Sequence, residues 1–382
     1  MIEIFYILYS LICFKSTKYI GPLGFLCGIL LLFTAVFSYL IHPFSFQLNL
    51  LNFISGVVYF FYLLVVLKKF KFIYKLKKKI SLTYNKKTLL VICLTILFIK
   101  FSFTILYDID IEMYRMINTI DVIISLIVYP IIFFLVIKND RFSYLLIIFL
   151  LIPNLFGESR GAIIFPLFFT FSVIKVIHNL KFNFSKLLIL GILTLSILIL
   201  INNRRYNTSN LTDFTSNIIS RGDAVFHYKY SMDNDVKISR SFSDAMASTF
   251  LFIVPRNFWV NKPYLSTFEL TKAAYGTSID NIVSLNMSVF WFDLIENKNT
   301  RILFYLTNIF FLLIFSTQIN YFFKIRSLYI LFLIISLAPD LLLLPESGLF
   351  DSPSGRKIIT KLILSPIGFY FIKKTLFKNI IT

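Results

Sequence analysis

The chain contains few charged residues. Of its 382 residues, 15% are Asp, Glu, Lys or Arg and 58% are hydrophobic. Because soluble globular domains are about one quarter charged, this composition excludes an ordinary soluble domain and indicates an integral membrane protein. Acidic residues are the scarcer kind: Asp and Glu number 19, Lys and Arg 38, and the net charge is +19. Membrane proteins gather lysine and arginine in their cytoplasmic loops, which explains the excess without a nucleic-acid partner.

Residues that bind metals and nucleotides are also scarce. The sequence has three histidines and three cysteines, and it contains neither an HExxH motif nor paired cysteines at metal-binding spacing. A glycine-rich phosphate loop followed by Lys-Ser or Lys-Thr is absent as well. We therefore expect no metal and no cofactor. Cys13, Cys27 and Cys93 each lie in an apolar run, and we expect them to be small hydrophobic residues of the core.

Long apolar runs, by contrast, are abundant. A helix that crosses a bilayer needs about twenty mostly apolar residues, and the sequence offers about eleven such runs. They lie near residues 2–14, 21–41, 49–67, 88–107, 119–137, 142–157, 161–178, 185–202, 302–319, 327–345 and 358–374. The predicted fold is therefore all-α, a polytopic integral membrane protein.

A lysine-rich run sets the predicted orientation. The sequence LKKFKFIYKLKKK ends at Lys79, and the preference of basic loops for the inner side places it in the cytoplasm. Alternation from this point puts the N-terminus outside and the C-terminus in the cytoplasm, with every short basic loop inside. Among the acidic residues only Asp140 then falls inside, whereas nine of the eleven arginines fall outside. Arginine binds phosphate with a planar fork, so this distribution indicates either an outer phosphate site or chance.

One outer segment, between the eighth and ninth predicted spans, is far longer than the other connections. Connections of this length are usually functional or disordered. Because it holds both tryptophans, Trp259 and Trp291, we expect a folded and partly helical subdomain. The chain is thus divided into an N-terminal transmembrane bundle of about eight spans at 1–202, a large outer (periplasmic) loop at 203–301 and C-terminal transmembrane helices at 302–382.

Two helices are expected in the second half of this outer loop. Ser243 and Asp244 can cap a first helix that runs to about Val254. Ser266 and Glu269 have the spacing of a capping box, in which each side chain satisfies a backbone N–H of the first turn, and they predict the start of a second helix.

The stretch IVPRNFWVNKPYL, residues 253–265, joins the two predicted helices. Pro255 and Pro263 fix their own φ angles and restrict the residues before them, so the corner is rigid before any ligand binds. Amphipathic tryptophan rings suit the membrane–water interface, and we expect the corner near the lipid headgroups. The side chains that it presents are Arg256, Trp259 and Lys262.

Two further outer stretches carry residues of functional types. NLFGESRGA, at 154–162, holds Arg160 beside glycines that let a ligand approach the backbone closely. SRGDAVFHYKY, at 220–230, holds Asp223 and His227, which lie one turn apart on a helix. A carboxylate can orient an imidazole, as in general-base pairs. The alternative is that these outer residues merely face solvent.

Together these features resemble the bacterial repeat-unit polymerases of O-antigen and capsule assembly, the Wzy type. About eleven spans with one large outer loop in the second half match the outline of that family. The Ser-Arg-Gly turn at 159–161 is similar to its first outer arginine site. The element Pro-Arg-x-x-Trp-x-x-Lys-Pro at 255–263 is similar to its Pro-Arg-x-x-Trp-Pro-x-Lys-Pro corner. The chain departs from the family at Val260, where proline is usual, and at SVFWFDLIENKN, which replaces a glycine-rich aromatic stretch.

The resemblance implies a glycosyltransferase of the bacterial cytoplasmic (inner) membrane. Its substrates are oligosaccharide repeat units linked to a polyprenyl carrier through diphosphate, and it transfers the growing glycan to the incoming unit at the outer face. Membrane lipid is a further partner, and the family leaves room for a chain-length regulator. The catalytic residues are then predicted to be Arg221, Asp223, His227 and Arg256, and the substrate-binding residues Arg160, Arg205, Arg240, Trp259 and Lys262.

Three other functions remain open at this point. An O-antigen ligase performs the same chemistry with lipid A-core as the acceptor. A flippase or transporter for lipid-linked oligosaccharides would bind the same substrate, although the sequence shows no internal repeat of the kind that transporters use. A scaffold protein would use the outer loop to bind a partner domain.

Overall fold

The computed structural model describes residues 2–41, 50–73, 82–84, 86–106, 124–128, 131–132, 135, 145–147, 168–169, 171–172, 174–175, 189, 224–251, 258–259, 261–275, 290–322, 337–346 and 348–380. The α-helices are α1 (Ile2–Ile20), α2 (Pro22–Ile41), α3 (Leu50–Ile73), α4 (Lys86–Leu106), α11 (Ala224–Asp233), α12 (Phe242–Phe250), α13 (Ser266–Tyr275), α14 (Lys298–Phe322) and α16 (Pro353–Leu376). The shorter elements are η1 (Ile124–Val128), η3 (Trp291–Leu294), η4 (Leu344–Glu346), β1 (Leu82–Tyr84) and β2 (Phe377–Ile380).

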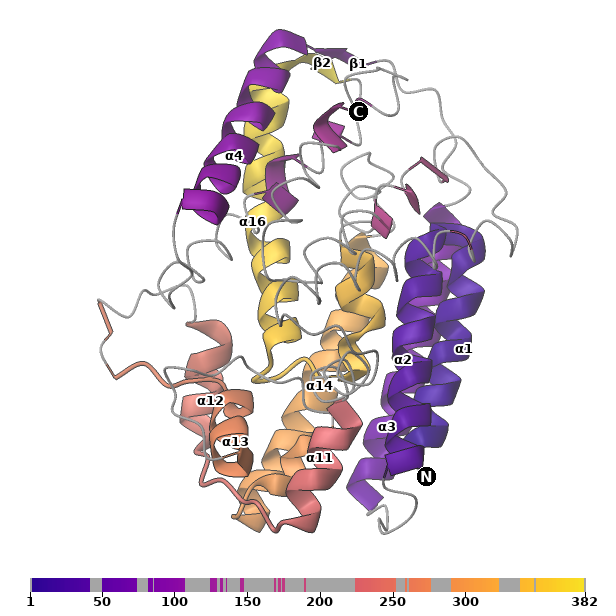
Figure 1. The fold of residues 1–382 in the computed structure, drawn as a ribbon, viewed down its shortest axis with the longest axis vertical. Coiled ribbons are helices and arrows are strands. Elements are labelled where there is room, and N and C mark those ends of the chain that lie inside the picture. The colour runs from indigo at the N-terminus through magenta and orange to yellow at the C-terminus, as the bar shows by residue number, and fades with distance from the viewer. Residues whose placement is uncertain are drawn as a thin grey trace.

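Helices dominate the described part of the chain, which confirms the predicted all-α class. One small departure is the pairing of β1 with β2, which are antiparallel, with Leu82 opposite Ile380 and Thr83 opposite Asn379. The sequence did not predict this pairing, because strands of three and four residues are too short to show a periodic pattern. The pairing places the residues after α3 beside the end of α16 (Figure 1).

The first two helices form a tight hairpin. The sequence predicted that the first helix ends near residue 14, but α1 continues to Ile20 because the basic side chains of its last turns are favourable at a helix C-terminus. The chain then turns at Gly21, whose φ of +76° is a left-handed conformation that glycine adopts without strain. Close contact follows at Gly24, where an added Cβ atom would lie 2.8 Å from the backbone nitrogen of Thr17 and 3.0 Å from the carbonyl oxygen of Cys13.

We expect Gly24→Ala to destabilise the protein, because the backbones of α1 and α2 must move apart to admit the methyl group. Such overpacking costs about 1–3 kcal/mol, offset by roughly 1 kcal/mol of helix propensity. Gly28→Ala is the matched control, since the atoms nearest to its added Cβ belong to the ring of Phe14, which can rotate. Thermal unfolding in detergent should show the lower midpoint for Gly24→Ala, and equal midpoints for the two variants would contradict the proposed backbone contact.

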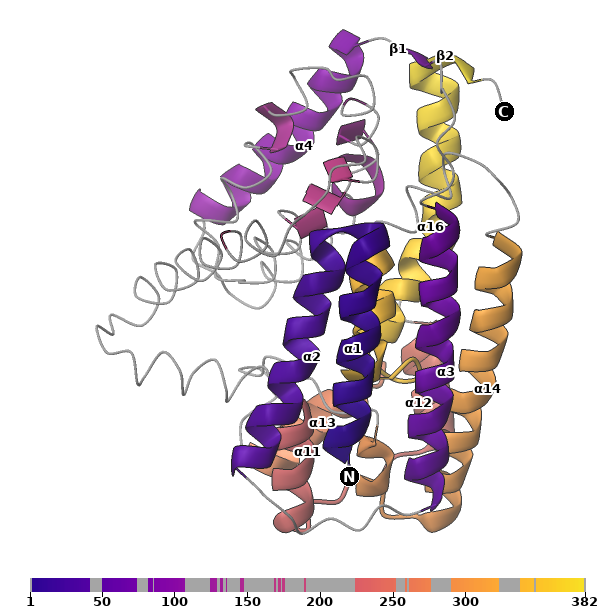
Figure 2. The ribbon, with the colours of Figure 1, turned by 90° about the vertical axis from the view of Figure 1, so that its right-hand side faces the viewer.

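Helix α3 lies between α1 and α14 and runs parallel to both (Figure 2). The Tyr9 hydroxyl of α1 donates to the carbonyl oxygen of Gly56 at 2.9 Å. On the other side, the amide of Asn308 in α14 donates to the Tyr59 hydroxyl at 3.1 Å. Buried hydroxyl and amide groups must find partners, and here the pairs fix the register of three helices.

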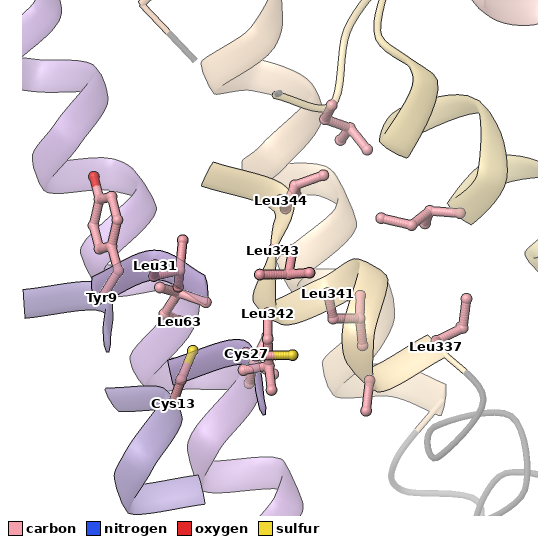
Figure 3. Packing of buried hydrophobic residues seen from close by; sticks show 14 of the residues in the cluster. Tyr9, Cys13, Cys27, Leu31, Leu63, Leu337, Leu341, Leu342, Leu343 and Leu344 are labelled. Carbon is pink, nitrogen blue, oxygen red and sulfur yellow. The ribbon is translucent and has the colours of Figure 1, made fainter. Parts of the chain in front are cut away.

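The buried hydrophobic core is continuous between the N-terminal helices and the segment before α16 (Figure 3). The residues labelled in the figure are Tyr9, Cys13, Cys27, Leu31 and Leu63 from the first three helices and Leu337, Leu341, Leu342, Leu343 and Leu344 from the later segment. All three cysteines are buried in this core and form no disulfide, which confirms that they are hydrophobic residues of the core.

Two described helices are long and apolar enough to cross a membrane, over Leu50–Lys71 and Lys298–Gln318. Both coincide with predicted spans. Shorter apolar helices at Pro22–Val36 and Leu90–Ser102 match two more. The predicted spans at 119–137, 142–157, 161–178, 185–202 and 327–345 lie wholly or mostly outside the described residues, so the total of eleven stays a prediction.

Acidic residues are distributed unevenly among the described helices. The N-terminus and helices α11 to α13 lie at one end, and the β1–β2 pairing lies at the other (Figures 1 and 2). Helices α2, α3, α4 and α14 contain no acidic residue. Exposed lysines occupy the last turns of α1, the C-terminal part of α3 and the first turn of α4, namely Lys15, Lys18, Lys68, Lys71 and Lys87.

Candidate functional site

The outer-loop helices form as the sequence predicts, but their caps differ. Helix α12 begins at Phe242, and its N-cap is Ser241, whose hydroxyl accepts the backbone N–H of Asp244 at 3.0 Å. The expected cap at Ser243 and Asp244 was therefore misplaced, because a serine two residues earlier takes that role. The helix also ends earlier than predicted, at Phe250.

Helix α13 begins at Ser266 as predicted, yet Ser266 and Glu269 do not form a capping box in this structure. The Ser266 hydroxyl donates to the carboxylate of Asp351, and the Glu269 carboxylate accepts from Arg240 at 2.9 Å. Both side chains that were expected to cap the helix thus bind charged partners in the interior. A buried ion needs these contacts more than a helix terminus that water can also satisfy.

Arg240 is the centre of this polar cluster. Its Nε donates to Asp351 Oδ2 at 3.1 Å and its Nη2 to Asp351 Oδ1 at 3.2 Å, a bidentate pair. Nη2 also donates to the Ser248 hydroxyl at 3.2 Å and to the Tyr264 carbonyl oxygen at 2.7 Å. Its Nη1 reaches Glu269. One guanidinium therefore connects α12, the residue that follows the corner, α13 and the segment before α16.

Asp351 completes the cluster from a distant part of the sequence. Its side chain is 0% exposed, and the hydroxyls of Ser248 and Ser266 both donate to it. Its backbone has a φ of +49°, which Asp tolerates better than most residues, and its N–H donates to the Thr249 hydroxyl at 2.9 Å. These contacts attach the C-terminal part of the chain, 302–382, to the outer loop.

Glu269 differs from Asp351 because it remains accessible. Its side chain is 33% exposed, whereas that of Arg240 is 2% exposed. Burial raises the pKa of Glu269 above its ordinary value, and the neighbouring Arg240 opposes that rise. The cluster thus contains one partly exposed carboxylate, that of Glu269, which is bound to the buried Arg240.

A second polar cluster lies where α3, α11, η3 and α14 meet. Asp293 Oδ2 accepts from Asn52 Nδ2 at 2.5 Å and from the Tyr228 hydroxyl at 3.0 Å. The Tyr305 hydroxyl donates to Asn52 Oδ1, and all four side chains are buried. Burial, and secondarily Asp293, raise the pKa of Tyr228 well above its usual value. The phenol therefore stays protonated and donates a hydrogen bond to Asp293.

Four of the predicted site residues lie in the described part of the chain. His227 is on α11 and only 2% exposed, so the surface open to a substrate does not include it. Arg240, predicted to bind substrate, is buried in the cluster above. Trp259 and Lys262 are half-buried and form a turn in which the Lys262 N–H donates to the Trp259 carbonyl oxygen at 3.1 Å. Arg160, Arg205, Arg221, Asp223 and Arg256 lie outside the described residues.

The sequence did not single out Asp351 or Asp293. It also did not predict that Glu269 binds a buried arginine. Asp351 lies in SGLFDSPSG, a run of turn residues between two predicted spans. Composition marks that run as a connection but does not indicate its partner, which lies 111 residues earlier.

The described site consists of a buried arginine bound to one buried and one partly exposed carboxylate. Among the described residues no group of three or more His, Cys, Asp or Glu side chains could hold a metal ion. Comparison of the chain with protein-family models, with curated proteins and with solved structures finds no match. The fold and the site thus define an all-α protein with helices able to span a membrane and a polar module at one end.

Proposed function

We propose that the chain is a multi-pass glycosyltransferase of the bacterial cytoplasmic membrane that polymerises lipid-diphosphate-linked oligosaccharide repeat units at the outer face. The proposal begins from the corner Pro-Arg-x-x-Trp-x-x-Lys-Pro at 255–263 and its resemblance to the Wzy-type polymerases. The described structure supports it through the arrangement of the outer loop and the helix directions.

The helix directions favour the predicted topology. Helices α1, α3 and α14 all begin at the end that carries α11 to α13, and Lys229 of α11 forms an ion pair with Glu3 of α1 there. The exposed lysines Lys15, Lys18, Lys68, Lys71 and Lys87 lie toward the opposite end, whereas Lys272 and Lys298 are exposed at the end of the outer loop. With the lysine-rich end in the cytoplasm, the N-terminus and the outer loop face the other side. This orientation agrees with an N-terminus outside and a C-terminus inside.

The observation that carries the proposal is the attachment of the corner to a buried ion pair. The carbonyl oxygen of Tyr264, near the end of the corner, and the carboxylate of Glu269 on α13 both bind Arg240. Arg240 in turn is held by Asp351. A rigid support of this kind is what a site needs in order to hold its contacting groups at fixed positions.

The proposed reaction needs groups that bind diphosphate and stabilise its negative charge as the glycosidic bond breaks. Arginine forks placed near the headgroups suit this task, and Arg160, Arg221 and Arg256 are the proposed contacts. Trp259 can stack on a sugar face, and Lys262 adds a positive charge. Arg240 supports the site from the interior and is not among the proposed substrate contacts.

The first experiment compares surface polysaccharide length on a gel in a deletion strain that carries wild type or Arg256→Ala. We expect wild type to restore a ladder and Arg256→Ala to reduce it to a single repeat, because the leaving diphosphate loses a charge-assisted contact. Removal of one such contact costs roughly 100-fold or more in rate. Lys272→Ala is the matched control, since it removes a positive charge from an exposed position of α13, and it should keep the ladder at equal expression.

The same gels separate the alternatives. Deletion that leaves full-length polymer unattached to lipid A-core would replace the polymerase by the ligase. Deletion that traps single lipid-linked repeat units on the cytoplasmic face would favour the flippase. An unchanged ladder with Arg256→Ala would reduce the corner to a structural turn.

A further inference from the structure

The carboxylates at the end of the molecule that carries α11 to α13, called the outer module below, differ in their exposure to solvent. Asp293 and Asp351 are buried, and Asp233, Asp235, Asp244 and Glu296 are exposed. Glu269 is intermediate and 33% exposed, open to the surface at one side and bound to a buried arginine at the other, whereas Glu3, bound to Lys229, is 14% exposed. A group that takes a proton from a substrate must be reachable and at the same time held in place.

We propose that Glu269 is the general base that removes the proton from the acceptor hydroxyl, with Arg240 and Asp351 as its positioning residues. This inference rests on the proposed function. It replaces His227, whose burial removes it from the accessible surface, and it uses a residue that the sequence had assigned to helix capping.

The position of Glu269 follows from two attachments. It lies in the first turn of α13, four residues after Leu265, the last residue of the corner. Arg240 binds both the Glu269 carboxylate, at 2.9 Å, and the Tyr264 carbonyl oxygen, at 2.7 Å. The carboxylate of Glu269 and the carbonyl oxygen of Tyr264, near the end of the corner, therefore share one anchor, Arg240.

The step balances without a co-reactant. The acceptor hydroxyl oxygen forms a bond to the anomeric carbon of the growing chain, while the bond from that carbon to the phosphate oxygen breaks. The electron pair of the broken bond leaves with the lipid diphosphate. The hydroxyl proton passes to the Glu269 carboxylate, which later releases it to water.

The electrostatic surroundings of Glu269 make its carboxylate a stronger base than an ordinary glutamate. Burial raises its pKa, Arg240 lowers it, and the negative charges of Asp351 and Asp244 raise it further. The net direction is upward from the ordinary glutamate value. Because the deprotonated carboxylate is the active form, activity falls as the pH drops through this pKa, and the fall begins at a higher pH than an ordinary glutamate would give.

The test measures polymerisation by the purified full chain, with the lipid-linked repeat unit extracted from the deletion strain as substrate. We expect Glu269→Gln to lower kcat by about 100-fold or more, the usual contribution of a general base, with a smaller change in KM and without the acid limb of the pH profile. Glu269→Asp should keep part of the activity and the acid limb. Glu296→Gln, the same change at an exposed position near α14, should behave as wild type.

The outcomes distinguish the two proposals. If wild type polymerises and Glu269→Gln keeps both its rate and its acid limb, Glu269 is not the base and the polymerase assignment stands. If wild type itself makes no polymer from the extracted unit, the proposed function fails and this inference with it. Unfolding midpoints measured on each variant show that the protein is folded, so a loss of rate with an unchanged midpoint supports the catalytic role.

Discussion

Replacing Asp351 with alanine is expected to destabilise the outer module by roughly 3–5 kcal/mol, the usual cost of breaking a buried ion pair from one side. The change leaves the Arg240 guanidinium buried without its bidentate partner, and it removes the acceptor of the Ser248 and Ser266 hydroxyls. The chain has two tryptophans, both in the outer loop, so denaturant unfolding followed by tryptophan fluorescence reports on this module directly.

The double variant Arg240→Met with Asp351→Leu is the matched control for this experiment. It removes both charges together, and such apolar replacements of buried pairs are often neutral or stabilising. We expect it to recover much of the stability that Asp351→Ala loses, although Ser266 still lacks its acceptor and the partly exposed Glu269 loses its arginine. A double variant as unstable as the single one would show that the loss arises from packing around Asp351 and not from the uncompensated charge.

The sequence predicted the helices of this protein better than their contacts. Apolar runs of about twenty residues located α2, α3, α4 and α14 to within a few residues. The outer helices α12 and α13 were also expected near their observed positions. These features are local, because a helix shows its period and its turn residues within a short window.

The candidate site was less predictable, because it depends on contacts between distant segments. Ser266 and Glu269 have the spacing of a capping box, and nothing local reveals that Arg240 and Asp351 bind them instead. Burial is equally invisible in a single sequence. His227 follows an acidic residue by one helical turn, as a general-base pair would, yet α11 packs so that its imidazole lies inside.

Asp293→Ala is the second substitution with a large expected effect. It removes the acceptor of two buried donors, Asn52 Nδ2 and the Tyr228 hydroxyl, and each unsatisfied donor costs about 1–3 kcal/mol. Because Asn52 belongs to α3 and Tyr228 to α11, the loss should loosen the outer loop from the helices that carry it.

Matched variants separate this effect from simple loss of charge. Asp293→Asn keeps a carbonyl oxygen for the same two donors and should lose less stability, and Tyr228→Phe, which removes one of the two donors to Asp293, should cost about 1 kcal/mol. Glu296→Ala, three residues away and exposed, should leave stability unchanged. In a Trp259→Phe background the fluorescence of Trp291, two residues before Asp293, follows unfolding at this junction. If the Asp293→Ala and Glu296→Ala variants unfold at this junction at the same denaturant concentration, the hydrogen bonds to Asp293 do not hold the loop on the helices. Apolar packing around Trp291 would then be what holds it.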